Sequence, residues 1–182
     1  YMSLDNSSCN LASLNLLKFL RQDGVFDAER FVRAVELIIT AMDISICFAD
    51  FPTEAIGETT RNFRQLGIGY ANLGALLMAM GKGYDTDGGR STAASITSIM
   101  TAVSYRRSAE LAGIVGPYNG YARNAEAHKR VMRRHRSANE SAPIMAADQT
   151  LHEVATRAWA PVVSLGETNG YRHAQAPVPV PY

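Results

Sequence analysis

The chain has 182 residues and 47% of them are hydrophobic, enough to bury the core of one domain or of part of a larger one. Its formal net charge of +1 argues against a partner selected by bulk charge, such as nucleic acid. Two cysteines are too few for a disulfide framework, and the apolar stretches are too short to span a bilayer. These features exclude the small secreted and transmembrane classes and predict a cytoplasmic protein without a membrane partner.

The first third of the chain predicts one strand and one strong helix. Residues 9–16 alternate loosely and contain neither Gly nor Pro, which is typical of a strand. Asp27 is a favourable N-cap, and Pro52 is expected to end the helix that follows it, near Asp50. Apolar residues recur on one face of this helix at steps of three and four: Phe31, Val35, Ile38, Met42 and Ile46.

Most of the remaining chain reads as further helices, so helices are expected over about 27–169. Thr53 caps a short helix, and a longer helix is predicted to run through Gly69 to Met80. Further helices are expected over about 90–115, 123–136 and 149–168, the last of them interrupted at Pro161. An extended tail over 171–182 is expected to close the chain.

Two short motifs each allow a functional and a structural interpretation. The pair Gly67 and Gly69 could begin a nucleotide-binding loop, but Asn72 occupies the third glycine position and no strand is expected before it. Close packing of a helix through small residues is favoured instead. The basic run over 128–136 could bind nucleic acid, but it contains no interleaved aromatic residue and is better explained as a solvated helix face.

The histidines and cysteines carry little signal by themselves. The four histidines lack the spacing of metal ligands, so no metal site is predicted. Cys47 follows the apolar stripe of its helix and is expected to be a small buried hydrophobe. Cys9 lies at the start of the predicted strand, and composition alone makes it a core cysteine.

Several motifs resemble the catalytic subunit of ribonucleotide reductases, and three of them resemble the adenosylcobalamin-dependent class in particular. Residues 8–16 (SCNLASLNL) are similar to the family strand that carries a substrate-reducing cysteine. Residues 61–69 (RNFRQLGIG) are similar to the family's Arg-x-Leu-Gly-Ile-Gly helix. The class-specific similarities are in residues 41–52, 84–90 and 115–124.

The resemblance implies that residues 1–182 are a mainly α part of a ten-stranded α/β barrel domain, with short strands near both ends. It implies that Cys9 is one of the redox-active cysteine pair and that Pro181 is the proline of a loop that binds substrate phosphate. It also implies adenosylcobalamin as the cofactor, a ribonucleotide substrate, a thiol reductant and the remainder of the reductase chain as partners. The family's Asn-x-Cys-x-Glu radical motif and the partner of Cys9 are absent from the sequence. The chain is therefore expected to be an internal fragment that is inactive alone.

The C-terminal end departs from the family pattern, in which Arg-Asn-Ala-Gln-Ala is followed by a strand. Here His173 replaces the Asn, and Pro177, Pro179 and Pro181 remove alternate backbone donors. Residues from about Ala176 onward are therefore expected to be extended but unpaired. The alternative for the whole chain is a non-catalytic helical interaction or structural module derived from this scaffold.

Overall fold

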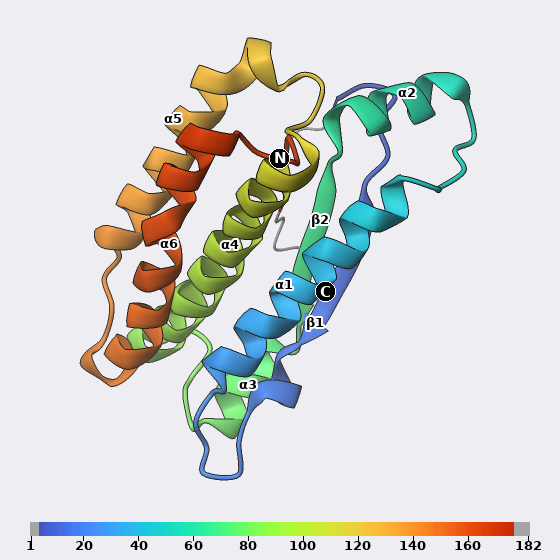
Figure 1. Cartoon of the computed structure of the whole chain (residues 1–182). Helices are drawn as coiled ribbons and strands as arrows, with labels where there is room; N and C mark the ends of the chain where they lie inside the picture. The colour runs from blue at the N-terminus through green and yellow to red at the C-terminus, as the bar shows by residue number, and fades with distance from the viewer. Residues whose placement is uncertain (1–3, 177–182) are drawn as a thin grey trace.

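The computed structural model describes residues 4–176, in which helices form two layers beside a two-stranded sheet (Figure 1). The strands are β1 (Asn10–Asn15) and β2 (Leu66–Ala71). The long helices α1 (Ala28–Ile46) and α4 (Asp87–Val115) run beside the sheet, and α6 (Gln149–Asn169) packs along α4 with α5 (Tyr121–Glu140) against it. The shorter elements are α2 (Glu54–Phe63), α3 (Leu73–Ala79) and the 3-10 helices η1 (Leu16–Phe19) and η2 (Ala146–Asp148).

The two strands are parallel, and α1 and α2 form the crossover between them. The register runs from Asn10 opposite Leu66 to Asn15 opposite Ala71. Residues 10, 12 and 14 are half-buried, whereas the alternate residues are exposed, with Leu11 at 64%. Ala12 and Leu14 pack against the hydrophobic core, so β1 turns this face toward the helices.

The prediction of a helix through Gly69 was wrong, because residues 66–71 form β2. Arg64 has a φ of 49° and caps the end of α2, which stops the helix before these residues. Asn72, with a φ of 66°, turns the chain again into α3. The two glycines therefore lie within a strand, and not at the strand-to-helix turn that a nucleotide-binding loop requires.

Several helix boundaries follow the local signals in the sequence. Asp27 and Thr53 are N-caps, as predicted, and their side chains accept hydrogen bonds from the backbone N–H groups of Arg30 and Ile56. Helix α1 ends at Ile46, earlier than predicted. Helix α6 passes through Pro161 without the predicted interruption.

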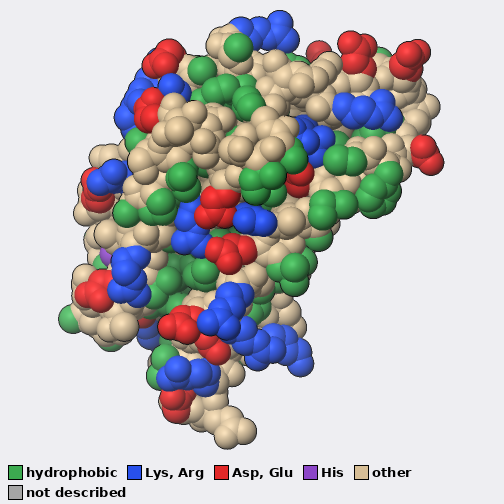
Figure 2. Space-filling view, viewed as in Figure 1, with side chains coloured by type: hydrophobic (Ala, Val, Ile, Leu, Met, Phe, Trp, Pro, Cys, Tyr) green, Lys and Arg blue, Asp and Glu red, His purple; other side chains and the backbone are tan. Residues whose placement is uncertain are grey.

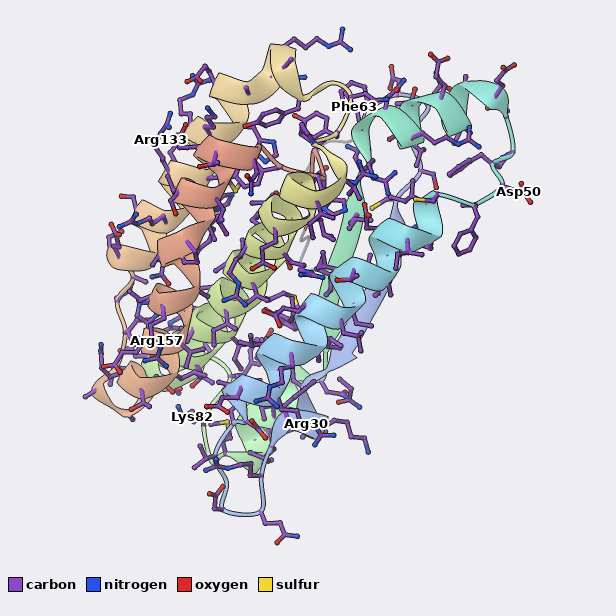
Figure 3. All side chains as sticks on the ribbon, in the orientation of Figure 1. Arg30, Asp50, Phe63, Lys82, Arg133 and Arg157 are labelled. Carbon is purple, nitrogen blue, oxygen red and sulfur yellow. The ribbon has the colours of Figure 1, made fainter. Side chains whose placement is uncertain are left out.

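The core lies between the sheet, α1, α4 and α6. Its fully buried members include Phe31 and Ile39 of α1, Ile68 of β2, Ile99 of α4 and Val162 of α6. At one end, Phe63 reaches from α2 toward the loop before α5 (Figure 3), and the centroid of its ring lies 6.0 Å from that of Tyr118. Among residues 4–176, no helix combines the length and apolar character needed to cross a bilayer.

The C-terminal segment differs from the expected short strand, because the described residues after α6 are assigned to no strand. The backbone is nevertheless bonded: Gln175 accepts a hydrogen bond from the N–H of Leu66, at 2.9 Å between N and O. Ala176 is fully buried, and its N–H donates to the hydroxyl of Tyr105, so it does not begin an unpaired tail. The rest of that prediction, with Pro177, Pro179 and Pro181, lies outside the described residues.

Candidate active site around Cys9

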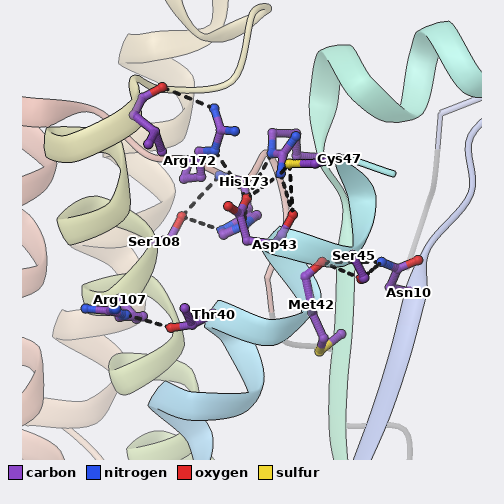
Figure 4. A network of polar contacts seen from close by, with 12 residues as sticks. Asn10, Thr40, Met42, Asp43, Ser45, Cys47, Arg107, Ser108, Arg172 and His173 are labelled. Carbon is purple, nitrogen blue, oxygen red and sulfur yellow. Dashed lines mark hydrogen bonds and ion pairs between the residues drawn. The ribbon is translucent and has the colours of Figure 1, made fainter. Parts of the chain in front are cut away.

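Cys9 immediately precedes β1, and the residues on either side of it are fixed by side-chain hydrogen bonds. The N–H of Ser8 donates to the hydroxyl of Thr60 in α2, at 2.9 Å. The amide of Asn10 donates to the hydroxyl of Ser45 at 2.6 Å and to the carbonyl of Met42 at 3.3 Å, both in α1 (Figure 4). Two helices thus hold the backbone on both sides of the thiol, which limits where it can move.

The thiol of Cys9 lies against β2 at a position where only glycine leaves room. A Cβ atom placed on Gly67 would lie 3.1 Å from the sulfur of Cys9 and 2.5 Å from a methyl carbon of Leu11. Since Leu11 lies on the exposed face of β1, the thiol is on the side of the sheet away from α1. The absent side chain at Gly67 therefore creates the space that the thiol occupies.

The electrostatic surroundings keep Cys9 protonated. Its side chain is half-buried, and burial raises the pKa of the thiol above its ordinary value. The sulfur contacts the carbonyl oxygen of Asn10 at 3.7 Å. A protonated thiol can donate a hydrogen atom, whereas only the deprotonated thiolate is a strong nucleophile.

Cys47 differs from its prediction as a buried hydrophobe, because its side chain is exposed. Helix α1 ends at Ile46, so Cys47 takes the C-cap position and leaves the buried stripe of the helix. Its sulfur contacts the guanidinium of Arg64 at 3.7 Å. Within residues 4–176, the hydrogen bonds of the two sulfur atoms do not join Cys47 to Cys9.

The basic run lies on α5, and part of its charge is neutralised. Lys129 and Arg133 both pair with Glu167 of α6, at 2.8 and 2.7 Å. Figure 2 shows the same mixture on one face of the molecule, where Lys and Arg side chains alternate with Asp and Glu. This pattern is typical of a solvated helix face.

The histidines are occupied by packing and hydrogen bonds. His128 is buried, its ring stacks on Tyr171, and burial lowers its pKa to about 4. His135 stacks on Trp159, and His152 bonds the carbonyl of Asn139. Within residues 4–176, no three His, Cys, Asp or Glu side chains are grouped as metal ligands would be.

An apolar cavity lies apart from Cys9. It has a volume of about 520 Å3 and lies between α5 and the C-terminal segment. Its walls are mainly apolar and aromatic, and include Leu4, Phe63, Tyr105, Tyr118, Val131 and Ala174. Neither Cys9 nor Gly67 lines it, so the cavity is not the space in front of the thiol.

The sequence placed Cys9 at the start of the strand but missed the residues that hold it. No sequence pattern marked Thr60 as a functional residue, because its hydrogen bond with the N–H of Ser8 joins residues 52 positions apart. Asn10 offered a signal, since it is a polar residue on the half-buried alternate positions of β1. Pro181, the predicted substrate-phosphate residue, lies outside the described part of the chain.

A parallel strand pair joined by helices, with a cysteine at the start of the first strand, is part of an α/β architecture. The sequence profile of the ribonucleotide reductase barrel domain matches residues 1–182, so the chain belongs to this family. The structure contains two of the strands of such a barrel, and its sheet is not closed within residues 4–176.

Individual relatives carry a more specific name. The chain is 65% identical over 193 residues to a vitamin B12-dependent ribonucleotide reductase of Streptantibioticus cattleyicolor, covering 99% of this chain and 32% of the relative. It is 66% identical over 186 residues to that of Streptomyces coelicolor and 43% over 185 residues to that of Rhodopirellula baltica. These two matches cover all of this chain but only 19% and 17% of the relatives. The chain thus spans between about a sixth and a third of the length of these relatives.

Proposed function

We propose that this chain is part of an enzyme that reduces ribonucleotides to 2′-deoxyribonucleotides, with Cys9 as one of its two substrate-reducing cysteines. The observation that carries the proposal is the position of the Cys9 thiol. It is fixed from both sides by α1 and α2, kept protonated by burial, and given room by Gly67. Relatives with the name of vitamin B12-dependent ribonucleotide reductase match across the chain.

The proposed reaction balances with two thiols. The bond between the 2′-carbon and its hydroxyl breaks, the hydroxyl leaves as water, and a C–H bond forms at the 2′-carbon. The two thiols supply the two hydrogens and the two electrons, and they become one disulfide. A thiyl radical on a cysteine outside this chain activates the 3′-position first, and an external dithiol then restores the cysteine pair by exchange.

The cofactor of the complete enzyme is proposed to be adenosylcobalamin, which supplies the initiating radical when bound. The described residues do not fit a site for it. The cavity between α5 and the C-terminal segment, about 520 Å3, has the size that suits a drug-sized ligand, and a corrin ring with its nucleotide tail is much larger. The histidines that could approach a metal are engaged in stacking or hydrogen bonds. We therefore propose that most of the cofactor site lies in the remainder of the reductase chain.

The substrate and the other partners follow from the same proposal. The substrate is a ribonucleoside diphosphate or triphosphate, and the loop that contains Pro181 is proposed to bind its phosphate groups. The thiol reductant is external. The remainder of the reductase chain must supply the radical cysteine and the partner of Cys9, because the only other cysteine here is Cys47.

The decisive experiment compares the two cysteines in the complete reductase. Cys9→Ser should abolish turnover with a dithiol as reductant, because serine cannot form the disulfide. Cys47→Ser is the matched control and should retain activity, since this exposed side chain lies outside the proposed reaction. Deoxyribonucleotide formation is measured by chromatography. Full turnover by Cys9→Ser, or its loss in Cys47→Ser alone, would contradict the assignment.

Disulfide mapping provides a second readout that does not depend on turnover. After a single turnover without reductant, the peptide that contains Cys9 should be linked to a cysteine from outside residues 1–182. A Cys9 peptide that stays reduced while product forms would remove Cys9 from the reaction.

A further inference from the structure

The side chain of Asn10, the first residue of β1, ties this strand to α1 (Figure 4). Its amide nitrogen donates to the hydroxyl of Ser45 at 2.6 Å and to the carbonyl of Met42 at 3.3 Å. The hydroxyl of Ser45 donates its single hydrogen to the carbonyl of Met42 at 2.8 Å, so its oxygen is available as an acceptor. The two acceptors on α1 are thus matched to a side chain that offers two N–H donors.

The neighbouring residues cannot take the place of Asn10. Side chains alternate between the two faces of a strand, so Cys9 and Leu11 point away from α1 while Asn10 points toward it. Neither a thiol nor a leucine side chain offers two N–H groups. A shift of the strand by one residue would therefore leave the acceptors of α1 without their donor and would turn the Cys9 thiol toward the helix.

The pairing with β2 requires the same register. Leu11 lies opposite Gly67, and the space left by the missing side chain of Gly67 is shared by Leu11 and the sulfur of Cys9. Leu66 and Ile68, on either side of this glycine, have fully buried side chains. Only one register places Gly67 beside the thiol and the amide of Asn10 on α1, so two separate contacts define the position of the thiol.

We propose that Asn10 is a positioning residue for Cys9: by binding α1, its amide holds the thiol in the space beside Gly67, on the opposite side of the sheet. The inference rests on the proposed function, in which this thiol reduces the substrate. Asn10 acts only through Cys9, to which it is covalently joined, because its own amide is directed to α1. The step that consumes the thiol should therefore depend on Asn10, whereas nucleotide binding should not.

The test replaces this amide in the complete reductase. Asn10→Leu keeps a similar volume and removes both N–H donors. The turnover number should fall about tenfold or more, because the thiol no longer stays in its reactive position, while the Michaelis constant for the ribonucleotide should change less than about threefold.

The reactivity of the thiol gives a readout that is independent of turnover. In Asn10→Leu, Cys9 should react faster with iodoacetamide, measured by mass spectrometry of the Cys9 peptide. Its pKa, obtained from the pH dependence of this reaction, should fall toward the ordinary value, because the burial that raises it is reduced. Cys47 is already exposed, so the alkylation of its peptide is the internal reference.

Asn15→Leu is the matched control, since Asn15 makes side-chain hydrogen bonds at the other end of β1. Its side-chain oxygen accepts from the N–H of Leu17 at 3.1 Å and from the amide of Asn72 at 3.0 Å. Loss of these bonds should lower the melting temperature and leave the turnover number and the alkylation of Cys9 unchanged. If Asn10→Leu behaves in the same way, its role is purely structural and the proposal is overturned.

A milder variant decides the case in which Asn10→Leu does not fold. Ser45→Ala removes the shorter of the two bonds and should lower the turnover number about threefold, with faster alkylation of Cys9. Unchanged turnover and alkylation in this variant would equally contradict the proposal.

The Cys9→Ser enzyme separates this inference from the proposed function. If Cys9→Ser retains turnover, the proposed function itself fails. If Cys9→Ser is inactive while Asn10→Leu is fully active, only the role of Asn10 is rejected.

Discussion

Gly67 shows how one missing side chain can shape a candidate active site. The strand position needs a residue without a Cβ, because both Leu11 and the Cys9 sulfur occupy the space where a Cβ would be. Its φ is not in the left-handed region, so the constraint comes from close approach and not from backbone conformation. The sequence suggested close packing at this glycine, but it placed the glycine in a helix.

We expect Gly67→Ala to destabilise the complete protein by about 1–3 kcal/mol, since the new methyl group overpacks the contact between β1 and β2. It should also displace the Cys9 thiol and lower turnover. Gly74→Ala is the matched control: its Cβ would meet nothing closer than 3.7 Å, and Ala favours the helix. Thermal melting measures both. Equal stability of the Gly67→Ala and unaltered proteins would show that the strands do not approach as described.

Cys47 marks a limit of inference from single residues. The apolar stripe of α1 predicted that Cys47 would be buried, but the helix ends one residue earlier. Pro52 signalled a helix end without fixing where it would fall. By contrast, Asp27 and Thr53 were recognised as caps because a cap depends only on the three residues that follow it.

Among the elements, α6 shows packing prevailing over local propensity. A proline inside a helix removes one backbone hydrogen bond and costs about 3 kcal/mol relative to Ala. Helix α6 nevertheless continues through Pro161, because Ala155, Ala158, Trp159 and Val162 are buried on its inner side. The sequence predicted an interruption because the burial of this face depends on α4, which lies far away along the chain.

Replacement of Pro161 tests this explanation. Pro161→Ala should raise the thermal melting temperature, because it restores a donor for the carbonyl of Arg157 in a helix that is already formed (Figure 3). The gain is limited to about 3 kcal/mol. Ala160→Pro, at the exposed neighbouring position, should lower stability by a similar amount. A lower melting temperature for Pro161→Ala would indicate that the proline ring itself contributes the packing.

Strand β2 was missed for a related reason. Burial does not alternate along residues 66–71, since Leu66, Ile68 and Tyr70 are buried and so are the intervening glycines. Only the pairing with β1, more than 50 residues earlier, makes this segment a strand. The segment nevertheless resembles a motif of the family, and the family was identified correctly. Only the local pattern predicted the wrong secondary structure.

For the molecule as a whole, the two halves of the proposed chemistry are separated along the chain. Cys9 precedes β1, and Pro181 comes after α6 in the sequence. Helix α1 bonds Asn10 beside Cys9 through Ser45 and the carbonyl of Met42, and its Asp43 accepts hydrogen bonds from Arg172 and His173 after α6. Helix α1 thus contacts residues near both ends of the described chain, a relation that the sequence could not predict because His173 and Asp43 are 130 residues apart.

We expect the 182-residue chain alone to form no deoxyribonucleotide from ribonucleotides with adenosylcobalamin and a dithiol. The sequence lacks the Asn-x-Cys-x-Glu motif, and its other cysteine, Cys47, lies outside the proposed reaction, so that reaction has no thiyl radical and no disulfide partner. The purified chain is incubated with diphosphate and triphosphate substrates, and products are separated by chromatography. The complete reductase, under the same conditions, is the positive control. Deoxyribonucleotide formed by the chain alone would contradict the account, since Cys9 and Cys47 would then have to perform both the radical and the reducing steps. An inactive chain beside an active complete enzyme is the result expected of a barrel segment whose remaining catalytic groups belong to other parts of the reductase.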